Sequence, residues 1–90
     1  MNSRATERFW QLFEELPGEV RTQARNAFKQ FEDDPFHPGL KFKNVTTRRP
    51  SWSVRITRDY RAPGIRDGDQ ITWIWVGSHA DYDHEIKHSR

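Results

Sequence analysis

The chain has 90 residues, a formal net charge of +2 and no cysteine, which excludes a second domain, a disulfide framework and a thiolate zinc site. Six Phe, four Trp and two Tyr favour a folded core over disorder, because each aromatic side chain can bury roughly 150–250 Å². No signal peptide is recognisable and no stretch approaches the ~20 apolar residues of a membrane span, so we expect a cytoplasmic protein without membrane contact.

Two amphipathic helices are predicted in the first part of the chain, at about residues 5–16 and 18–32. Their apolar residues recur at the three-and-four spacing of a helical face, and Ser3 or Thr6 can cap the first helix. The apolar positions are Phe9, Trp10, Leu12, Phe13 and Leu16, then Val20, Ala24, Ala27, Phe28 and Phe31. Pro17 suits the first turn of the second helix, and Asp34, the residue before Pro35, is disfavoured in a helix. A helical hairpin follows.

Beyond Gly39 the hydrophobic period changes from about 3.6 to 2, which predicts strands at about residues 40–45, 51–57, 60–65 and 70–77. Asp67-Gly68-Asp69 is a strong turn signal between the last two strands. Pro63 lacks an amide donor, so its strand should lie at an edge or be locally broken there. The last strand is apolar on both faces, with Ile71, Trp73 and Trp75 on one of them, and is expected to be central.

The predicted fold class is therefore α+β, in a single domain of residues 1–90. An N-terminal helical hairpin packs on a twisted antiparallel sheet of about four strands, and a short helix at about residues 80–88 ends the chain.

Positive charge is concentrated in the middle of the chain. Residues 40–66 carry eight basic side chains against Asp59 alone, a net +7, whereas residues 1–39 and 67–90 carry −2 and −3. The eight are Lys41, Lys43, Arg48, Arg49, Arg55, Arg58, Arg61 and Arg66. This asymmetry suggests a basic face for a polyanion, although an ordinary solvated surface is the plain alternative.

Four side chains could combine to cleave RNA through its own 2′-hydroxyl. If Trp52, Val54 and Ile56 face the helices, Arg55 faces the opposite side of the sheet, where Arg61 on the next strand can reach it. Arginine suits phosphate binding and the stabilisation of a phosphorane-like transition state. The last strand then delivers His79, a natural acid or base, and Tyr82, whose hydroxyl could move a proton if nearby arginines lowered its pKa.

Each of these residues also has a structural interpretation. A histidine after a strand commonly makes a structural hydrogen bond, and a C-terminal tyrosine commonly packs its ring. Arg55 and Arg61 could pair with Asp59 and Asp81 on the surface.

The segment His84-Glu85-Ile86-Lys87-His88 matches the H-E-x-x-H pattern of zinc proteases. Such a site needs a third ligand, a rigid helix and a cleft, whereas this match ends two residues before the end of the sequence. We therefore expect no metal or other cofactor, and interpret the segment as the polar end of a short helix.

The chain resembles the RelE/ParE superfamily of toxins from type II toxin–antitoxin systems, in particular RelE-like and HigB-like members. The resemblance rests on "ATERFWQLFEELP", "VRTQARNAFKQFEDDPFHPGLKFK", "WSVRITRDYRA" and "GDQITWIWVGSHADYD", and is most specific in "SVRITRDYRA" and "WVGSHADYD". It implies a compact toxin held inactive by a cognate antitoxin that covers its active surface. RelE-like members cleave mRNA in the ribosomal A site without metal.

The resemblance also implies roles for individual residues. Arg61 matches the arginine of the family's "YR" strand element, Arg55 a basic residue of the preceding strand, and His79 and Tyr82 the C-terminal acid and base. The side chains that would hold ribosomal or messenger phosphates are Lys41, Lys43, Arg48, Arg49 and Arg58. The expected partners are thus an antitoxin, the ribosome and mRNA; a gyrase poison of the ParE type and an inactive binding relative remain the alternatives.

Overall fold

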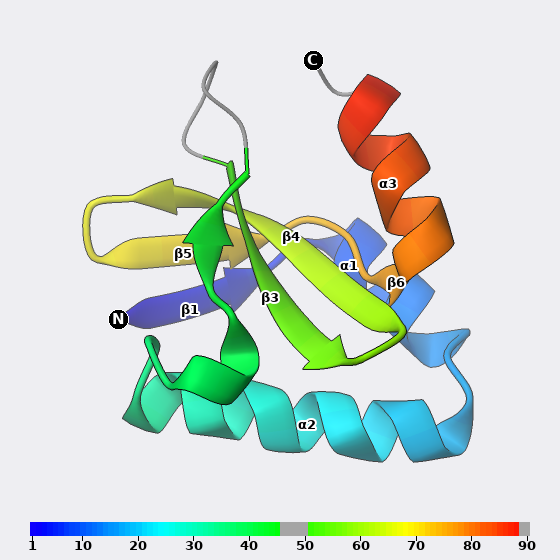
Figure 1. Ribbon diagram of the computed structural model, residues 1–90, viewed down its shortest axis with the longest axis horizontal. Coiled ribbons are helices and arrows are strands. Elements are labelled where there is room, and N and C mark those ends of the chain that lie inside the picture. Colours follow the sequence, from blue (N-terminus) through cyan, green and yellow to red (C-terminus); the bar gives the residue numbers. More distant parts are fainter. Residues whose placement is uncertain (46–50, 89–90) are drawn as a thin grey trace.

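The computed structural model describes the backbone of residues 1–45 and 51–88 and the side chains of residues 1–45 and 51–84. Two helices, α1 (Glu7–Glu14) and α2 (Gly18–Asp33), pack on a sheet, and a third, α3 (His79–His88), follows the last strand (Figure 1). The strands are β1 (Asn2–Ala5), β2 (Lys43–Asn44), β3 (Ser51–Thr57), β4 (Tyr60–Asp67), β5 (Gln70–Trp73) and β6 (Gly77–Ser78), with a short 3₁₀ turn η1 (Pro38–Leu40) before β2. The α+β class is confirmed.

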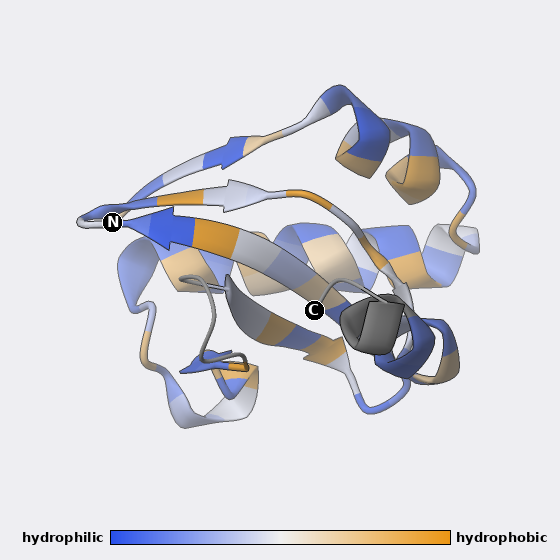
Figure 2. Cartoon of the chain, turned by 90° about the horizontal axis from the view of Figure 1, so that it is seen from above, coloured by the Kyte–Doolittle hydropathy of each residue, from blue (hydrophilic) through white to orange (hydrophobic). Residues whose placement is uncertain are grey.

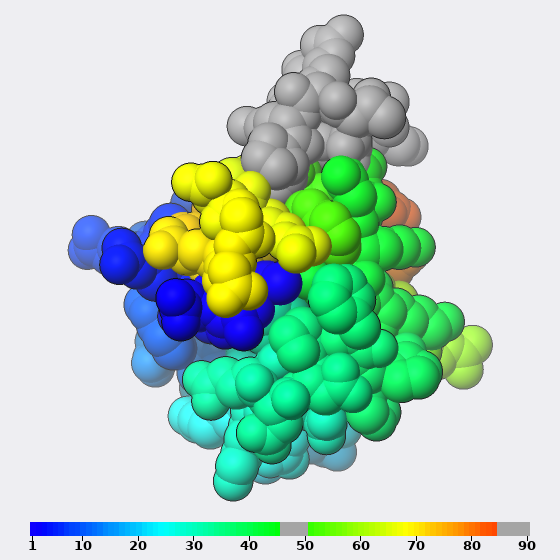
Figure 3. Space-filling view, turned by 90° about the vertical axis from the view of Figure 1, so that its left-hand side faces the viewer, coloured from blue at the N-terminus to red at the C-terminus, as the bar shows by residue number. Residues whose placement is uncertain are grey.

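The sheet is mixed and has more strands than predicted. Its order is β1-β5-β4-β3-β2, with β6 paired to the remaining part of β4. The sequence analysis missed β1, a polar four-residue strand that pairs parallel with β5, from Asn2 opposite Gln70 to Ala5 opposite Trp73. Figure 3 shows β1, in blue, beside the yellow β4–β5 turn. The prediction of an antiparallel sheet is therefore wrong at this one pair.

β4 is an inner strand, so the edge position considered for Pro63 is wrong. The alternative, a local break, is what the structure has: β5 pairs with β4 up to Trp73, β6 pairs with it from Gly77, and residues 74–76 between them are not strand. The Pro63 carbonyl accepts a hydrogen bond from the Ile74 amide. Because the nitrogen and carbonyl of one strand residue point to the same side, the missing Pro63 donor faces this interruption.

The interruption also changes which side chains share a face. Ile71, Trp73 and Val76 belong to the main core cluster, whereas Trp75, although only 7% exposed, does not. The predicted grouping of Trp75 with Ile71 and Trp73 is therefore wrong, because strict alternation requires an unbroken strand.

The main core lies between the helices and the sheet. Figure 2 shows α1 and α2 banded in hydrophobic and hydrophilic residues, as expected of amphipathic helices. Phe31 of α2 is fully buried and makes edge-on contacts with Phe42 and Trp73, at centroid distances of 4.9 and 5.2 Å. Thr6 caps α1 by accepting a hydrogen bond from the Phe9 amide. No helix among the described residues is both long and apolar enough to span a membrane.

Candidate active site

The face of the sheet opposite α1 and α2 carries the predicted arginine pair. Val54 and Ala62 are cross-strand partners on the helix side and are fully buried, so their neighbours Arg55 and Arg61 project from the other side. Arg55 and Arg61 are themselves cross-strand partners, and both are partly exposed. Two like charges directly opposite each other are unfavourable, and a bound anion between them would offset the repulsion.

Arg61 is held by the turn that joins β3 to β4. Its Nη1 donates hydrogen bonds to the backbone carbonyls of Thr57, Arg58 and Tyr60, at 2.5, 3.1 and 3.0 Å. Partial burial and, secondly, the positive charge of Arg55 lower the pKa of the Arg61 guanidinium, while Tyr82, Asp59 and Asp83 act in the opposite direction. Arg61 thus has a fixed position beside the acidic and aromatic residues of α3.

Arg55 is the less constrained of the two. Neither arginine forms an ion pair with Asp59 or Asp81 among the described residues; an ion pair observed there joins His79 and Asp83. Arg55 also makes no side-chain hydrogen bond within the described parts of the chain. The surface ion pairing that was the structural alternative for these residues is therefore not observed there, and the Arg55 guanidinium is available to a ligand.

The first turn of α3 is anchored beside this pair. Ser78 caps the helix by accepting a hydrogen bond from the Asp81 amide at 3.2 Å, and the His79 amide donates to the Asp59 carbonyl at 2.6 Å. His79 Nδ1 lies 3.5 Å from Asp83 Oδ2, one helical turn later, and both side chains are about half exposed, at 51% and 54%. His79 is therefore accessible to a ligand and oriented by a carboxylate.

Tyr82 differs from the expectation. Its side chain is only 8% exposed, and its hydroxyl shares a hydrogen bond with Ser53 of β3. Burial raises the pKa of the Tyr82 hydroxyl above its ordinary value; the Ser53 hydrogen bond and the Arg61 charge only partly oppose that shift. The lowered pKa that would activate Tyr82 is therefore not found: the Arg61 charge does act in that direction, but burial outweighs it because the phenolate would be poorly solvated. Tyr82 holds α3 against the sheet.

The other predicted phosphate-binding residues are spread more widely. Lys43 on β2 is exposed and lies opposite Ser53, and therefore on the same face as Arg55. Lys41 is exposed after η1 with a left-handed backbone, and Arg58 is exposed in the β3–β4 turn. Arg48 and Arg49 lie outside the described residues.

Two residues near the arginines were missed by the sequence analysis. Asp83 could have been found from its spacing, because it lies four residues after His79 and the helix begins at His79 rather than at about residue 80. Nothing in the sequence singles out Ser53, because a serine is common on the side of a strand that is expected to face solvent.

The described residues contain no group of three or more His, Asp or Glu arranged to hold a metal ion. The H-E-x-x-H segment lies within α3, but its side chains from Glu85 onward are outside the described ones. Neither observation therefore tests the prediction that this segment holds no metal.

The arrangement has the fold of bacterial and archaeal toxins. The RelB–RelE antitoxin–toxin complex from Methanococcus jannaschii matches with a TM-score of 0.72 and 17% identity, over 90% of this chain and 96% of that one. The RelBE2 complex from Mycobacterium tuberculosis matches with a TM-score of 0.69 and 17% identity, over 87% and 96%. The YoeB/ParE toxin from Agrobacterium tumefaciens matches with a TM-score of 0.67 and 19% identity, over 88% and 99%.

Residues 18–84 match the family model of the ParE-like toxin domain. The chain therefore belongs to the ParE-like toxin family, as the RelE/ParE resemblance predicted. None of the curated proteins matches the chain.

Proposed function

We propose that this toxin cleaves messenger RNA on the ribosome, through the RNA's own 2′-hydroxyl. The observation that carries the proposal is the cross-strand pair Arg55 and Arg61, with His79 nearby at the start of α3. A phosphate between the two guanidinium groups relieves their repulsion, and its charge increases as the phosphorane-like transition state forms. This is the chemistry that the RelE resemblance implies.

His79 is the group that moves a proton in this proposal. In the cleavage step a base removes the 2′-hydroxyl proton, the oxygen attacks phosphorus, and the 5′-oxygen departs with a proton from an acid, leaving a 2′,3′-cyclic phosphate. The imidazole of His79 is exposed and has the Asp83 carboxylate 3.5 Å from Nδ1, a position from which it can orient the ring and favour the tautomer that accepts a proton at Nε2. Tyr82 remains protonated in its buried position and supports α3.

The neighbouring cations would guide the message across the sheet. Lys43 is exposed on the same face as Arg55, and Lys41 and Arg58 add charge at the ends of the neighbouring strands. Contacts of this type bind phosphates without reading bases, so sequence preference would come from the ribosome and the codon it presents.

We also propose that a cognate antitoxin holds the toxin inactive. Two of the similar structures are complexes of a toxin with its antitoxin, and the net +7 segment is complementary to an acidic protein segment that folds on binding.

The test is to add the purified protein to ribosomes carrying a defined message and to map the cleavage sites by primer extension. Wild type should cut within the A-site codon; His79→Ala should lower the rate by about 10²–10⁴-fold at an unchanged melting temperature. His37→Ala, another exposed histidine, serves as the matched control. An intact message at every codon would exclude the proposal.

The family match to ParE-like toxins favours one alternative, a non-enzymatic gyrase poison. In that case a supercoiling assay would respond to the protein, and His79→Ala would leave the response unchanged. Growth arrest on induced expression, relieved by the co-expressed neighbouring gene, separates both toxins from an inactive relative.

A further inference from the structure

Three aromatic rings and an arginine gather beyond the end of α2, away from the arginine pair. They are Phe36 and Phe42 from the connection between α2 and β2, Trp52 of β3 and Arg66 of β4, and we call them the Phe36 patch. The buried Phe42 ring lies 4.7 Å from the Trp52 ring and 5.5 Å from the Phe36 ring, measured between centroids. Phe36 is 58% exposed, which is unusual for so large an apolar residue.

The Arg66 guanidinium lies against the exposed side of these rings. Its Cζ is 4.6 Å from the centroid of Trp52 and 5.9 Å from that of Phe36, both within the range of a cation–π contact. Its Nε donates to the Gly68 carbonyl at 3.0 Å, whereas its Nη atoms make no hydrogen bond or ion pair within the described residues. The α2–β2 connection, in green, and the β4–β5 turn, in yellow, both face the viewer in Figure 3. The Nη donors are therefore available to an anionic ligand.

Local hydrogen bonds order the connection that carries Phe36. The Phe36 amide donates to Asp34 Oδ1 at 3.2 Å, and His37 Nδ1 accepts from the Gly39 amide at 3.1 Å. Lys41, farther along, is exposed and has a left-handed backbone with φ of 46°, a conformation that favours glycine. A lysine at this position adds a positive charge at a cost in backbone strain, which is typical of residues that contact a ligand.

We propose that the Phe36 patch stacks an unpaired base of single-stranded RNA, with Arg66 and Lys41 bonded to the phosphates beside it. An exposed aromatic ring next to an arginine suits such a ligand, because every base has a π-face and every nucleotide carries a negative charge. The choice of RNA rests on the proposed function. The contact itself uses no residue of the cleavage site, so it can be measured without cleavage.

The patch lies beside the edge of the sheet that leads to the cleavage site. In the described sheet β2 is the terminal strand on this side, and its Lys43 lies on the same face as Arg55. Its next residue, Asn44, is opposite Trp52 and therefore on the face of the patch. An RNA strand that passes round this edge can reach both the patch and Lys43, which extends binding beyond the scissile phosphate.

A protein partner suits the patch less well. An apolar protein side chain could pack on Phe36, but it would cover the Arg66 Nη donors without accepting their hydrogen bonds. The charge nearby favours a polyanion, because residues 40–66 carry a net +7. Of the acidic neighbours, Asp34 already accepts from the Phe36 amide, and Asp67 follows Arg66 on the opposite face of β4.

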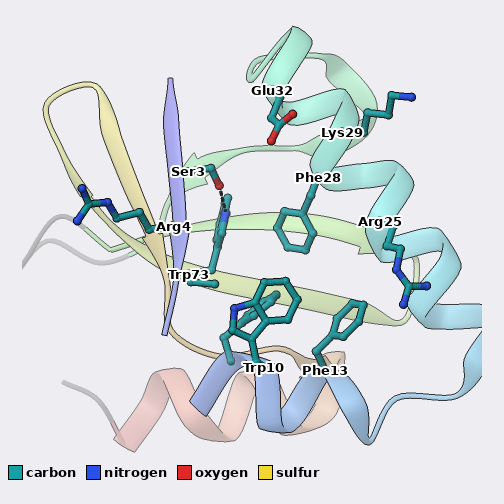
Figure 4. Close-up of a pocket in the computed structure, with 11 residues that line it drawn as sticks. Ser3, Arg4, Trp10, Phe13, Arg25, Phe28, Lys29, Glu32 and Trp73 are labelled. Carbon is teal, nitrogen blue, oxygen red and sulfur yellow. Dashed lines mark hydrogen bonds between the residues drawn. The ribbon is translucent and has the colours of Figure 1, made fainter. Parts of the chain in front are cut away.

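The test measures the Kd of a fluorescent, single-stranded RNA of eight nucleotides with 2′-O-methyl groups, which prevent cleavage through the 2′-oxygen. Phe36→Ala should raise the Kd about 5–150-fold, the loss of one stacked base. Phe36→Trp should restore the affinity, whereas Phe36→Leu should not, because leucine is apolar but has no π-face. Trp10→Ala is the matched control and should bind as wild type does. Trp10 is also exposed, at 52%, but lines a groove beside β1, the terminal strand at the opposite edge (Figure 4).

Two further measurements separate stacking from charge. Heparin, a polyanion without bases, should bind Phe36→Ala as tightly as wild type. Arg66→Ala should reduce the slope of log Kd against log salt concentration for the RNA by roughly 0.7, the loss of one phosphate contact. A 5-iodouridine at the centre of the oligonucleotide should crosslink to Phe36 under ultraviolet light, as mass spectrometry of the digested complex would show.

An equal Kd for wild type and Phe36→Ala would overturn the inference, as would an equal loss of heparin binding or full affinity in Phe36→Leu. These outcomes leave the proposed function standing if ribosome-dependent cleavage is intact. Conversely, stacking on Phe36 by a protein that leaves every message intact would refute the proposed function and confirm this contact.

Discussion

On the face of the sheet that meets α1 and α2, aromatic rings such as Phe31 and Trp73 fill a continuous core. On the opposite face α3 covers only part of the sheet, with Tyr82 hydrogen-bonded to Ser53, and leaves Arg55 and His79 accessible. Both faces belong to the same strands, so the difference comes from the elements or solvent that the side chains of each face contact. Changes on the first face should affect folding, whereas changes at the accessible Arg55 and His79 of the second should affect function at little cost in stability.

The largest effect is expected from Phe31→Ala. This side chain is fully buried between Phe42 and Trp73, and its removal should lower the free energy of unfolding by about 3–5 kcal/mol. Urea denaturation followed by circular dichroism measures the loss. Phe36→Ala, at a 58% exposed position, should cost about 1 kcal/mol or less, and equal losses in the two variants would contradict the assignment of the core.

Substitutions of Arg55 and Arg61 should separate an effect on the cleavage rate from an effect on the stability of the fold. Arg55→Ala should lower ribosome-dependent cleavage on the order of a hundredfold at an unchanged melting temperature, because the Arg55 side chain makes no hydrogen bond to the described residues. Arg61→Ala should lower cleavage similarly and also destabilise the fold by about 1.5–3 kcal/mol, since its guanidinium bonds three turn carbonyls. Arg8→Ala on the exposed side of α1 is the control. Equal melting temperatures for the two site variants would refute the distinction.

Gly77→Ala tests the interruption between β5 and β6. A Cβ at Gly77 would lie 2.5 Å from the Trp75 ring, so the ring must move, and we expect a loss of about 1–3 kcal/mol in thermal or urea unfolding. Gly18→Ala at the start of α2 meets nothing closer than the flexible end of Arg21, at 3.5 Å, and should be neutral or slightly stabilising. A neutral Gly77→Ala would mean that Trp75 is not confined.

The smallest effect is expected from Tyr82→Phe, which removes the hydrogen bond to Ser53 and should cost about 1 kcal/mol at pH 7. Burial keeps the folded-state pKa of Tyr82 above the unfolded value of about 10, so the unfolded chain releases this proton first as the pH rises. The associated stability is complete below pH 10 and is lost as the pH rises through the folded pKa.

Urea unfolding between pH 7 and 11 checks this sign. Wild type should lose more stability above pH 10 than Tyr82→Phe, because only wild type carries the Tyr82 hydroxyl. Parallel pH curves would mean that the Tyr82 hydroxyl ionises as freely in the folded protein as in the unfolded chain.

The α+β class, the helical hairpin and the arginine pair followed from the sequence alone, because they depend on local periodicity. A 3.6-residue period identifies the buried side of α2, and a 2-residue period is enough to put Arg55 on the face opposite Val54. The motif around Tyr60-Arg61 and the "WVGSHADYD" stretch likewise identified the toxin family, because a sequence motif can be recognised without a structure.

Only the tertiary structure decided which groups are free and which are occupied. β1 has no apolar alternation, and its pairing with β5 comes from a distant part of the chain, so no local pattern could reveal the open edge beside Trp10. The pKa of Tyr82 depends on the sheet beneath α3, which buries a hydroxyl that the sequence suggested would be activated. Periodicity assigns a side chain to a face, whereas solvation and hydrogen-bond partners depend on residues far along the chain.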